Sequence, residues 1–159
     1  MEKKKKILAP TDLSELSVVG IRSAMEMARS RDTELIVYHV IGYTEANVHD
    51  EAFYTESLVE FLLKERRRLL NKLLKENCSD IIPQVTMRQE VEVGVPYKRI
   101  VEKAVEEGVE LIVMSTHGRT GLLHMLIGSV TEKVVQRATC PVLSIRPAKD
   151  PRLPEALAG

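Results

Sequence analysis

The sequence has little of several features that mark special classes of protein. Its 159 residues include only two cysteines, which make no disulfide framework and have no metal-ligand spacing. The 23 basic and 23 acidic side chains cancel, so no net charge favours nucleic acid or an anionic membrane surface. No run approaches the roughly 18 apolar residues that span a bilayer. We therefore expect a reduced, cytoplasmic protein that binds neither nucleic acid nor membrane.

Signals for targeting and for internal division are also missing. The apolar run from Ile7 to Ala9 is far shorter than the roughly 7–15 residues of a secretory signal. No repeat or low-complexity linker interrupts the chain. A chain of this length can bury a core without disulfides or metal. We predict one domain over residues 1–147 and a flexible tail over 148–159, which is rich in Pro and Ala.

Strand-like and helix-like segments alternate along the chain. Apolar residues at helical spacing predict helices over 16–32, 58–77, 97–108 and 129–139. Apolar or alternating runs predict strands over 5–12, 34–41, 84–94, 109–117 and 141–147. Five strands separated by four helices indicate an α/β fold, with a parallel sheet covered by helices on both faces. Periodicity does not give the order of the strands.

The strand over 84–94 differs from the others because its polar and apolar residues alternate. Its two faces comprise Val85, Met87, Val91 and Val93 on one side and Thr86, Arg88, Glu90 and Glu92 on the other. This pattern predicts a half-exposed strand at an edge of the sheet.

The segment from Met114 to Val134 places glycines and hydroxyls on both sides of an apolar connector. Ligands of open α/β sheets bind beyond the carboxyl ends of strands, where the "STHG" of this segment lies. Gly118 would let backbone amides approach an anion, and Ser129 would add a hydroxyl at a helix N-terminus. A plainer explanation makes Gly118 a simple turn and Ser129 with Glu132 a capping box. The residues alone leave both explanations open.

The spacing favours the phosphate site. Ser115-x2-Gly118-x9-Gly128-Ser129 resembles the nucleotide-binding signature of the universal stress protein family, Gly-x2-Gly-x9-Gly-Ser/Thr. The resemblance extends over nearly the whole chain, through "ILAPTDLSELS", "VYHVI", "GVPYKRIVEKA" and the stretch that ends at Pro147. It implies a Rossmann-like, adenine nucleotide alpha hydrolase-like fold with strand order 3-2-1-4-5. That order brings the carboxyl ends of strands one and four together and puts the alternating strand at an edge.

The resemblance also implies an ATP site at these two strand ends. Pro10, Thr11 and Asp12 would border the adenosine, with Val40 and Met114 against the base. The phosphates would be surrounded by Ser115, Gly118, Arg119, Gly128, Ser129, Val130 and Thr131. Mg²⁺ or Mn²⁺ would be coordinated mainly by the phosphates themselves. Plainer roles remain open, namely a helix cap for Asp12 and simple core packing for Val40 and Met114.

Ser115 departs from the signature, because the family has its first glycine there. We expect Ser115 to keep an ordinary backbone conformation, with its hydroxyl or amide facing the phosphates. If this expectation fails, the substitution favours a domain of the same family that binds no nucleotide and acts through protein contacts.

Signs of catalysis are missing. No Gly-x4-Gly-Lys-Ser/Thr motif places a lysine at the phosphates, and "PTDLSELS" lacks the glycines of the related pyrophosphatase loop. No carboxylate stands at a spacing that would orient His117, which fits a structural or solvent-facing role, and His39 fits a bonded core residue. We predict an ATP-binding sensor or regulator of the stress response that is not an enzyme. A slow ATP hydrolase is the second alternative.

The last strand predicts self-association. The segment from Pro141 to Arg146 is short, mostly apolar and follows the last helix, so it should form an edge strand. An exposed edge invites pairing with another copy of itself. We therefore expect a homodimer through this strand, as the family resemblance also implies.

Overall fold

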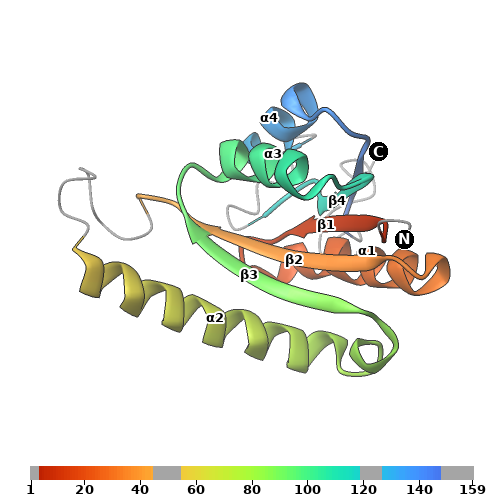
Figure 1. The fold of residues 1–159 in the computed structure, drawn as a ribbon, viewed down its shortest axis with the longest axis horizontal. Helices are drawn as coiled ribbons and strands as arrows, with labels where there is room; N and C mark the ends of the chain where they lie inside the picture. Colours follow the sequence, from red (N-terminus) through yellow and green to blue (C-terminus); the bar gives the residue numbers. More distant parts are fainter. Residues whose placement is uncertain (1–3, 45–54, 119–126, 148–159) are drawn as a thin grey trace, which may run out of the picture.

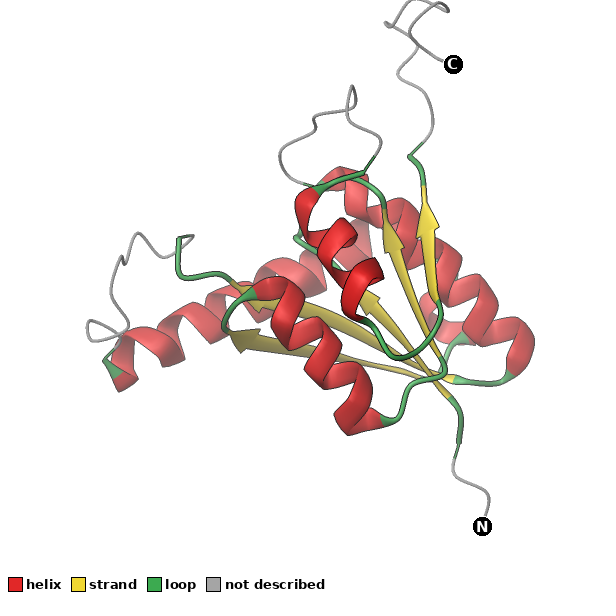
Figure 2. Cartoon of the chain, turned by 90° about the horizontal axis from the view of Figure 1, so that it is seen from above, coloured by secondary structure: helices red, strands yellow, loops and turns green. Residues whose placement is uncertain are grey.

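The computed structural model describes residues 4–44, 55–118 and 127–147, so Arg119 and the tail lie outside the described residues. These residues form a five-stranded parallel sheet of order β3-β2-β1-β4-β5 between two pairs of helices (Figures 1 and 2). The strands are β1 (Lys6–Pro10), β2 (Glu34–Ile41), β3 (Met87–Val93), β4 (Leu111–Ser115) and β5 (Val142–Ile145). The helices are α1 (Val18–Arg31), α2 (Glu56–Cys78), α3 (Pro96–Glu107) and α4 (Ser129–Arg137), with short 3-10 helices η1 (Glu15–Ser17) and η3 (Ile82–Gln84). The predicted fold class, strand order and edge positions are confirmed.

The helices divide evenly between the two faces of the sheet. Helices α1 and α2 pack on one face, where Ile21, Ala24, Met25 and Ala28 of α1 are all buried, as their spacing predicts. Helices α3 and α4 pack on the other face through Ile100, Ala104 and Val134 (Figure 1). No helix within the described ranges is long and apolar enough to cross a membrane.

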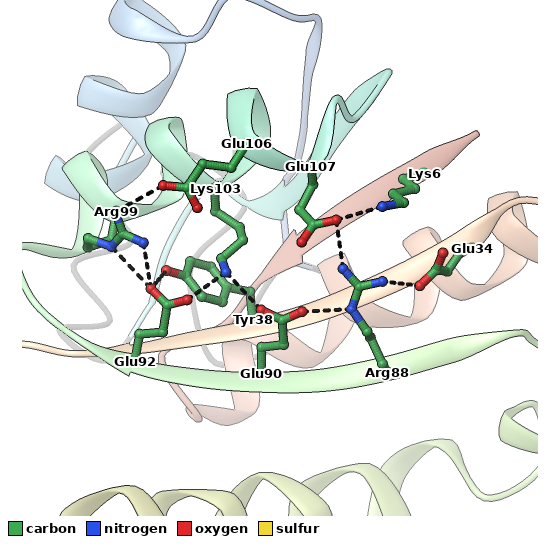
Figure 3. Close-up of polar contacts among 10 residues, drawn as sticks. All are labelled: Lys6, Glu34, Tyr38, Arg88, Glu90, Glu92, Arg99, Lys103, Glu106 and Glu107. Atoms are coloured by element: carbon green, nitrogen blue, oxygen red, sulfur yellow. Dashed lines mark hydrogen bonds and ion pairs between the residues drawn. The ribbon is translucent and has the colours of Figure 1, made fainter. Parts of the chain in front are cut away.

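The polar face of β3 differs from the prediction of a solvent-exposed surface. Helix α3 lies across this face, and the charged residues between them form an ionic layer, defined as Lys6, Glu34, Arg88, Glu90, Glu92, Arg99, Lys103, Glu106 and Glu107 (Figure 3). The side chain of Lys103 is only 9% exposed and pairs with both Glu90 and Glu92. The alternation of β3 thus marks a charged interface between two elements as well as a sheet edge.

Glu107 closes the end of this layer and should make stability depend on pH. Hydrogen bonds from Lys6 and Arg88 lower the pKa of Glu107 from 4.5 to about 2. Between these values the unfolded chain binds a proton that the folded chain does not bind, so folding stability rises with pH across this window. We expect the free energy of unfolding, measured in urea, to fall as pH drops from about 4.5 to 2. The fall should be shallower in Glu107→Gln, and equal slopes would contradict the assignment.

Candidate functional site

A cavity of about 340 Å³ lies at the carboxyl ends of β1 and β4, where the order of the strands reverses. Its size falls within the range of small-molecule sites. It is lined by Pro10, Thr11, Asp12, Ser17, Tyr38, Val40, Thr44, Pro96, Ile100, Met114, Ser115, His117, Gly118, Gly128, Ser129, Val130 and Thr131. All the site residues predicted from sequence, Arg119 apart, therefore meet around one cavity, and their role in binding stays a prediction.

The turn after β1 is held by side chains. The hydroxyls of Thr11 and Ser17 lie 2.7 Å apart, and the Thr11 hydroxyl also accepts the backbone N–H of Leu13, whose φ is 66°. Oδ1 of Asp12 accepts hydrogen bonds from the backbone N–H and the hydroxyl of Ser14. These bonds fix a left-handed residue in the turn without glycine. Asp12 shapes this turn and is not the N-cap of α1, which is Ser17.

Gly118 is fitted closely to the same turn. A Cβ atom at residue 118 would overlap the carboxylate of Asp12. The glycine therefore allows the end of the β4 loop to approach the turn after β1. This close approach closes one side of the cavity, so a side chain at this residue would displace Asp12.

The start of α4 favours an anion. Its N-cap is Gly128, which has no side chain to bond to the first turn, and Ser129 is already the first residue of the helix, so the capping box considered for Ser129 and Glu132 does not form. The first N–H groups of a helix have no acceptor within the helix. Ser129, Val130 and Thr131 supply these groups and line the cavity. Such a helix N-terminus attracts negative charge through its dipole and its N–H groups.

Two hydrogen bonds connect α4 to the end of β4. The backbone N–H of Gly128 donates to the carbonyl of Thr116 at 2.6 Å, and the Thr131 hydroxyl donates to the carbonyl of Ser115 at 2.9 Å. Both bonds fix the first turn of α4 against the strand that carries Met114. The helix start is therefore held in place across the cavity from the turn after β1.

The hydroxyl of Ser115 points away from the predicted phosphate site. It donates to the carbonyl of Leu16 at 2.9 Å and accepts the backbone N–H of Gly20 at 3.1 Å. Ser115 is not among the residues with positive φ, so its predicted ordinary conformation is confirmed. Of the two groups expected to face the phosphates, the hydroxyl does not, because η1 and the first turn of α1 lie close enough to take both of its bonds. The amide of Ser115 stays a prediction.

Ser115→Gly should therefore affect stability more than ligand affinity. Loss of one buried and one partly buried hydrogen bond, together with the greater freedom of glycine, should lower the free energy of unfolding by about 2 kcal/mol. The affinity for ATP, measured by calorimetry, should change by less than about tenfold, or about 1.4 kcal/mol. A wild-type protein that fails to bind ATP and a Ser115→Gly variant that binds it would contradict this prediction.

The apolar end of the cavity is built from core residues. Val40 and Met114 are only 5% and 6% exposed and belong to the core beneath α3 and α4, yet both line the cavity. The two roles suggested for Val40 and Met114, contact with the base and packing in the core, are therefore compatible. Pro96 and Ile100 of α3 add to the same wall. A wall of this kind suits a flat, weakly polar group.

The two histidines occupy different surroundings. His39 is buried, and its Nδ1 lies 2.8 Å from the carbonyl oxygen of Thr11, which confirms a bonded core residue. His117 is 3% exposed and lines the cavity, so a solvent-facing role is wrong. Its Nδ1 lies 2.8 Å from the hydroxyl of Thr116. The sequence argument considered only whether a carboxylate could orient His117, and this spacing does not reveal that His117 lines the cavity.

Sequence reasoning missed several residues of the wall. They are Ser17, Tyr38, Thr44, Pro96 and Ile100, together with His117. Tyr38 was within reach of sequence reasoning, because alternation along a strand puts it on the same face as Val40. The others come from elements whose packing the sequence pattern does not give. In the described part of the chain, no group of three or more His, Cys, Asp or Glu side chains could hold a metal ion.

A parallel sheet whose strand order reverses beside a cavity defines a Rossmann-like α/β protein. The chain belongs to the universal stress protein family, whose sequence profile matches residues 4–146. It is 33% identical to one universal stress protein of Methanocaldococcus jannaschii over 155 residues, with 89% of this chain and 94% of that protein covered. A second one from the same organism is 36% identical, with coverage of 91% and 84%.

Solved structures of relatives have the same fold. A structure of a Methanocaldococcus jannaschii protein, solved to assign its biochemical function, has a TM-score of 0.69 and 34% identity, covering 92% of this chain and 98% of that one. A universal stress protein from Archaeoglobus fulgidus in complex with dAMP has a TM-score of 0.62, with 21% identity and coverage of 91% and 99%.

Proposed function

We propose that the protein binds ATP in this cavity and acts as a sensor or regulatory module of the stress response. The observation that carries the proposal is the first turn of α4, which lines the cavity and whose N-cap, Gly128, offers it no side chain. The apolar wall around Val40 and Met114 supplies a place for the base at the other end. The Archaeoglobus fulgidus protein, which has the same fold, binds dAMP, and this supports an adenine nucleotide as the ligand.

The phosphates would lie against the N–H groups of Ser129, Val130 and Thr131 at the start of α4. Mg²⁺ or Mn²⁺ would be held mainly by the phosphate oxygens. Arg119 is proposed from the family signature alone, because it lies outside the described residues. The base would lie on the apolar wall, bordered by Pro10, Thr11 and Asp12.

Two measurements test the proposal. Calorimetry with ATP and magnesium should give a dissociation constant between micromolar and a few hundred micromolar. Mass spectrometry of the supernatant from denatured protein should identify any nucleotide retained through purification. Absence of binding for ATP, ADP and AMP would favour the domain that acts through protein contacts. The observation behind that second candidate is Ser115, which replaces the first glycine of the signature.

Turnover should be slow or absent, well below the typical enzyme rate of about 10 per second. Binding at a helix N-terminus orients the phosphates, but hydrolysis also needs a positioned base or a cationic group at the leaving oxygen. A steady-state assay with excess ATP and magnesium measures this rate. A robust ATPase that is lost in His117→Ala would contradict the prediction and make His117 a catalytic residue.

We further propose a homodimer through β5. The strand lies at the edge of the sheet and pairs with β4 on one side, and Leu143 is 38% exposed. An apolar edge of this kind can continue the sheet by pairing with a second copy. Light scattering should give twice the chain mass at micromolar concentration, and a monomer mass would remove the proposal.

A further inference from the structure

Tyr38 connects the apolar end of the cavity to the ionic layer between β3 and α3. Its side chain is fully buried on the same face of β2 as Val40, and it lines the cavity. Its hydroxyl donates to Oε2 of Glu92 at 2.8 Å, and Nζ of Lys103 lies 5.3 Å from the centre of its ring (Figure 3). One residue of the cavity wall is therefore held by charged residues outside the cavity.

Glu92 is the centre of this arrangement. Besides Tyr38, it accepts hydrogen bonds from Arg99 at 2.7 Å and pairs with Lys103 at 2.5 Å. Arg99 and Lys103 both belong to α3, whose residues Pro96 and Ile100 form another part of the cavity wall. The single carboxylate of Glu92 thus fixes Tyr38 of β2 and the cavity end of α3 relative to each other.

The charge states of these groups keep the arrangement intact at neutral pH. Burial opposes ionisation of Glu92, but hydrogen bonds from Lys103, Arg99 and Tyr38 outweigh it and lower its pKa to about 2. Burial, followed by the hydrogen bond to Glu92, raises the pKa of Tyr38 well above its ordinary value. Tyr38 is therefore a neutral donor and Glu92 a charged acceptor, which makes a strong hydrogen bond.

We propose that Glu92 is a positioning residue for ligand binding, holding Tyr38 and the start of α3 as the wall against which a planar base packs. The inference rests on the proposed nucleotide site and adds a residue that lines no part of the cavity itself. Replacing the carboxylate by the neutral amide of glutamine weakens the hydrogen bond from the Tyr38 hydroxyl and removes the negative charge shared by Arg99 and Lys103. Both changes loosen the base end of the site and leave the phosphate end, at α4, in place.

Glu107 provides a matched control. It lies in the same ionic layer, also accepts from two cationic side chains, Lys6 and Arg88, and also has a pKa lowered to about 2. It is at the carboxyl end of α3, far from Pro96 along the helix, and does not line the cavity (Figure 3). Glu92→Gln and Glu107→Gln therefore remove equivalent charges at opposite ends of one interface.

Calorimetry with three probes, ATP, adenosine and inorganic triphosphate, tests the proposal. Glu92→Gln should lower the affinities for ATP and for adenosine by the same factor, on the order of fivefold, and leave the affinity for inorganic triphosphate unchanged. Tyr38→Phe should show a smaller loss of the same kind. Glu107→Gln should bind all three probes as the wild type does, although it loses thermal stability. The proposal would be overturned if Glu92→Gln and Glu107→Gln lost the same affinity for ATP. It would also be overturned if Glu92→Gln lost affinity for inorganic triphosphate by the same factor as for ATP.

Hydrogen exchange of the ligand-free protein gives a second, independent test of the positioning role of Glu92. Glu92→Gln should speed exchange of the amides from Arg99 to Lys103, whereas Glu107→Gln should leave these amides protected. If wild-type protein binds none of the three probes, the proposed nucleotide function fails, and the exchange data alone decide the positioning role. Unchanged protection in Glu92→Gln would overturn it.

Discussion

Gly128→Leu should abolish ATP binding, with a loss of affinity of at least about a hundredfold, or about 2.7 kcal/mol. Residue 128 is the N-cap of α4 and lines the cavity beside the N–H groups proposed to bind phosphate. A leucine side chain there would occupy the phosphate volume. Its φ of −74° suits any residue, and an added Cβ would lie 3.1 Å from the carbonyl oxygen of Thr116, so the Cβ itself needs a shift of only a few tenths of an ångström. Calorimetry measures the loss.

Val135→Leu is the control for this variant. Val135 lies on the same helix, is 48% exposed and does not line the cavity. The Val135→Leu variant should keep the wild-type affinity for ATP, and both variants should give the circular dichroism spectrum of the folded protein. Unchanged affinity in Gly128→Leu would place the phosphates elsewhere.

Gly20→Ala should be among the most destabilising single-methyl changes in the protein, costing about 3 kcal/mol of the free energy of unfolding. An alanine Cβ would lie 2.7 Å from the backbone N of Ser115 and 2.9 Å from the backbone carbonyl carbon of Met114. Neither atom can move without displacing β4 from its place in the sheet. The hydrogen bond from the Gly20 N–H to the Ser115 hydroxyl would also be strained. Urea denaturation measures the cost.

Gly94→Ala is the matched control for this prediction. Its added methyl meets only side-chain atoms of Arg99 and no backbone atom, so Arg99 must shift against Glu92 but no strand is displaced, and the cost should be smaller than at residue 20. The double variant of Gly20→Ala with Ser115→Gly should cost less than the sum of the two single changes, because it removes the contact between the added methyl and the Ser115 hydroxyl. The double variant should still be less stable than the wild type by several kcal/mol, because removal of the Ser115 hydroxyl leaves both backbone contacts in place. Equal costs at residues 20 and 94 would contradict the close packing of α1 on β4.

Gly20 and Ser115 therefore explain how this chain departs from the family signature. The serine hydroxyl fits because residue 20 has no side chain, and it bonds to the backbone of η1 and α1 instead of filling the cavity. The substitution at Ser115 is thus compatible with a nucleotide beside it. A compensating glycine of this kind, 95 residues away in the sequence, is not visible in the signature itself.

The sequence by itself determined which segments become strands and helices, and which of them carry the candidate site. The apolar spacing of Ile21 to Ala28 and the alternation of β3 are local patterns, set by the periods of a helix and a strand. The spacing from Ser115 to Ser129 could be read from the sequence because it is a property of one continuous segment, and the residues that it marks line one cavity. The family resemblance then supplied the strand order that periodicity cannot give.

Only the tertiary structure decided what the polar side chains contact. The hydroxyl of Ser115 bonds to the backbone of η1 and α1, the polar face of β3 is covered by α3, and the hydroxyl of Tyr38 donates to Glu92. Each outcome depends on a partner far away in the sequence, and hydrogen bonds form only when both groups arrive within about 3 Å with suitable geometry. Periodicity assigns a residue to a face, whereas the packing of two elements decides which atoms meet there.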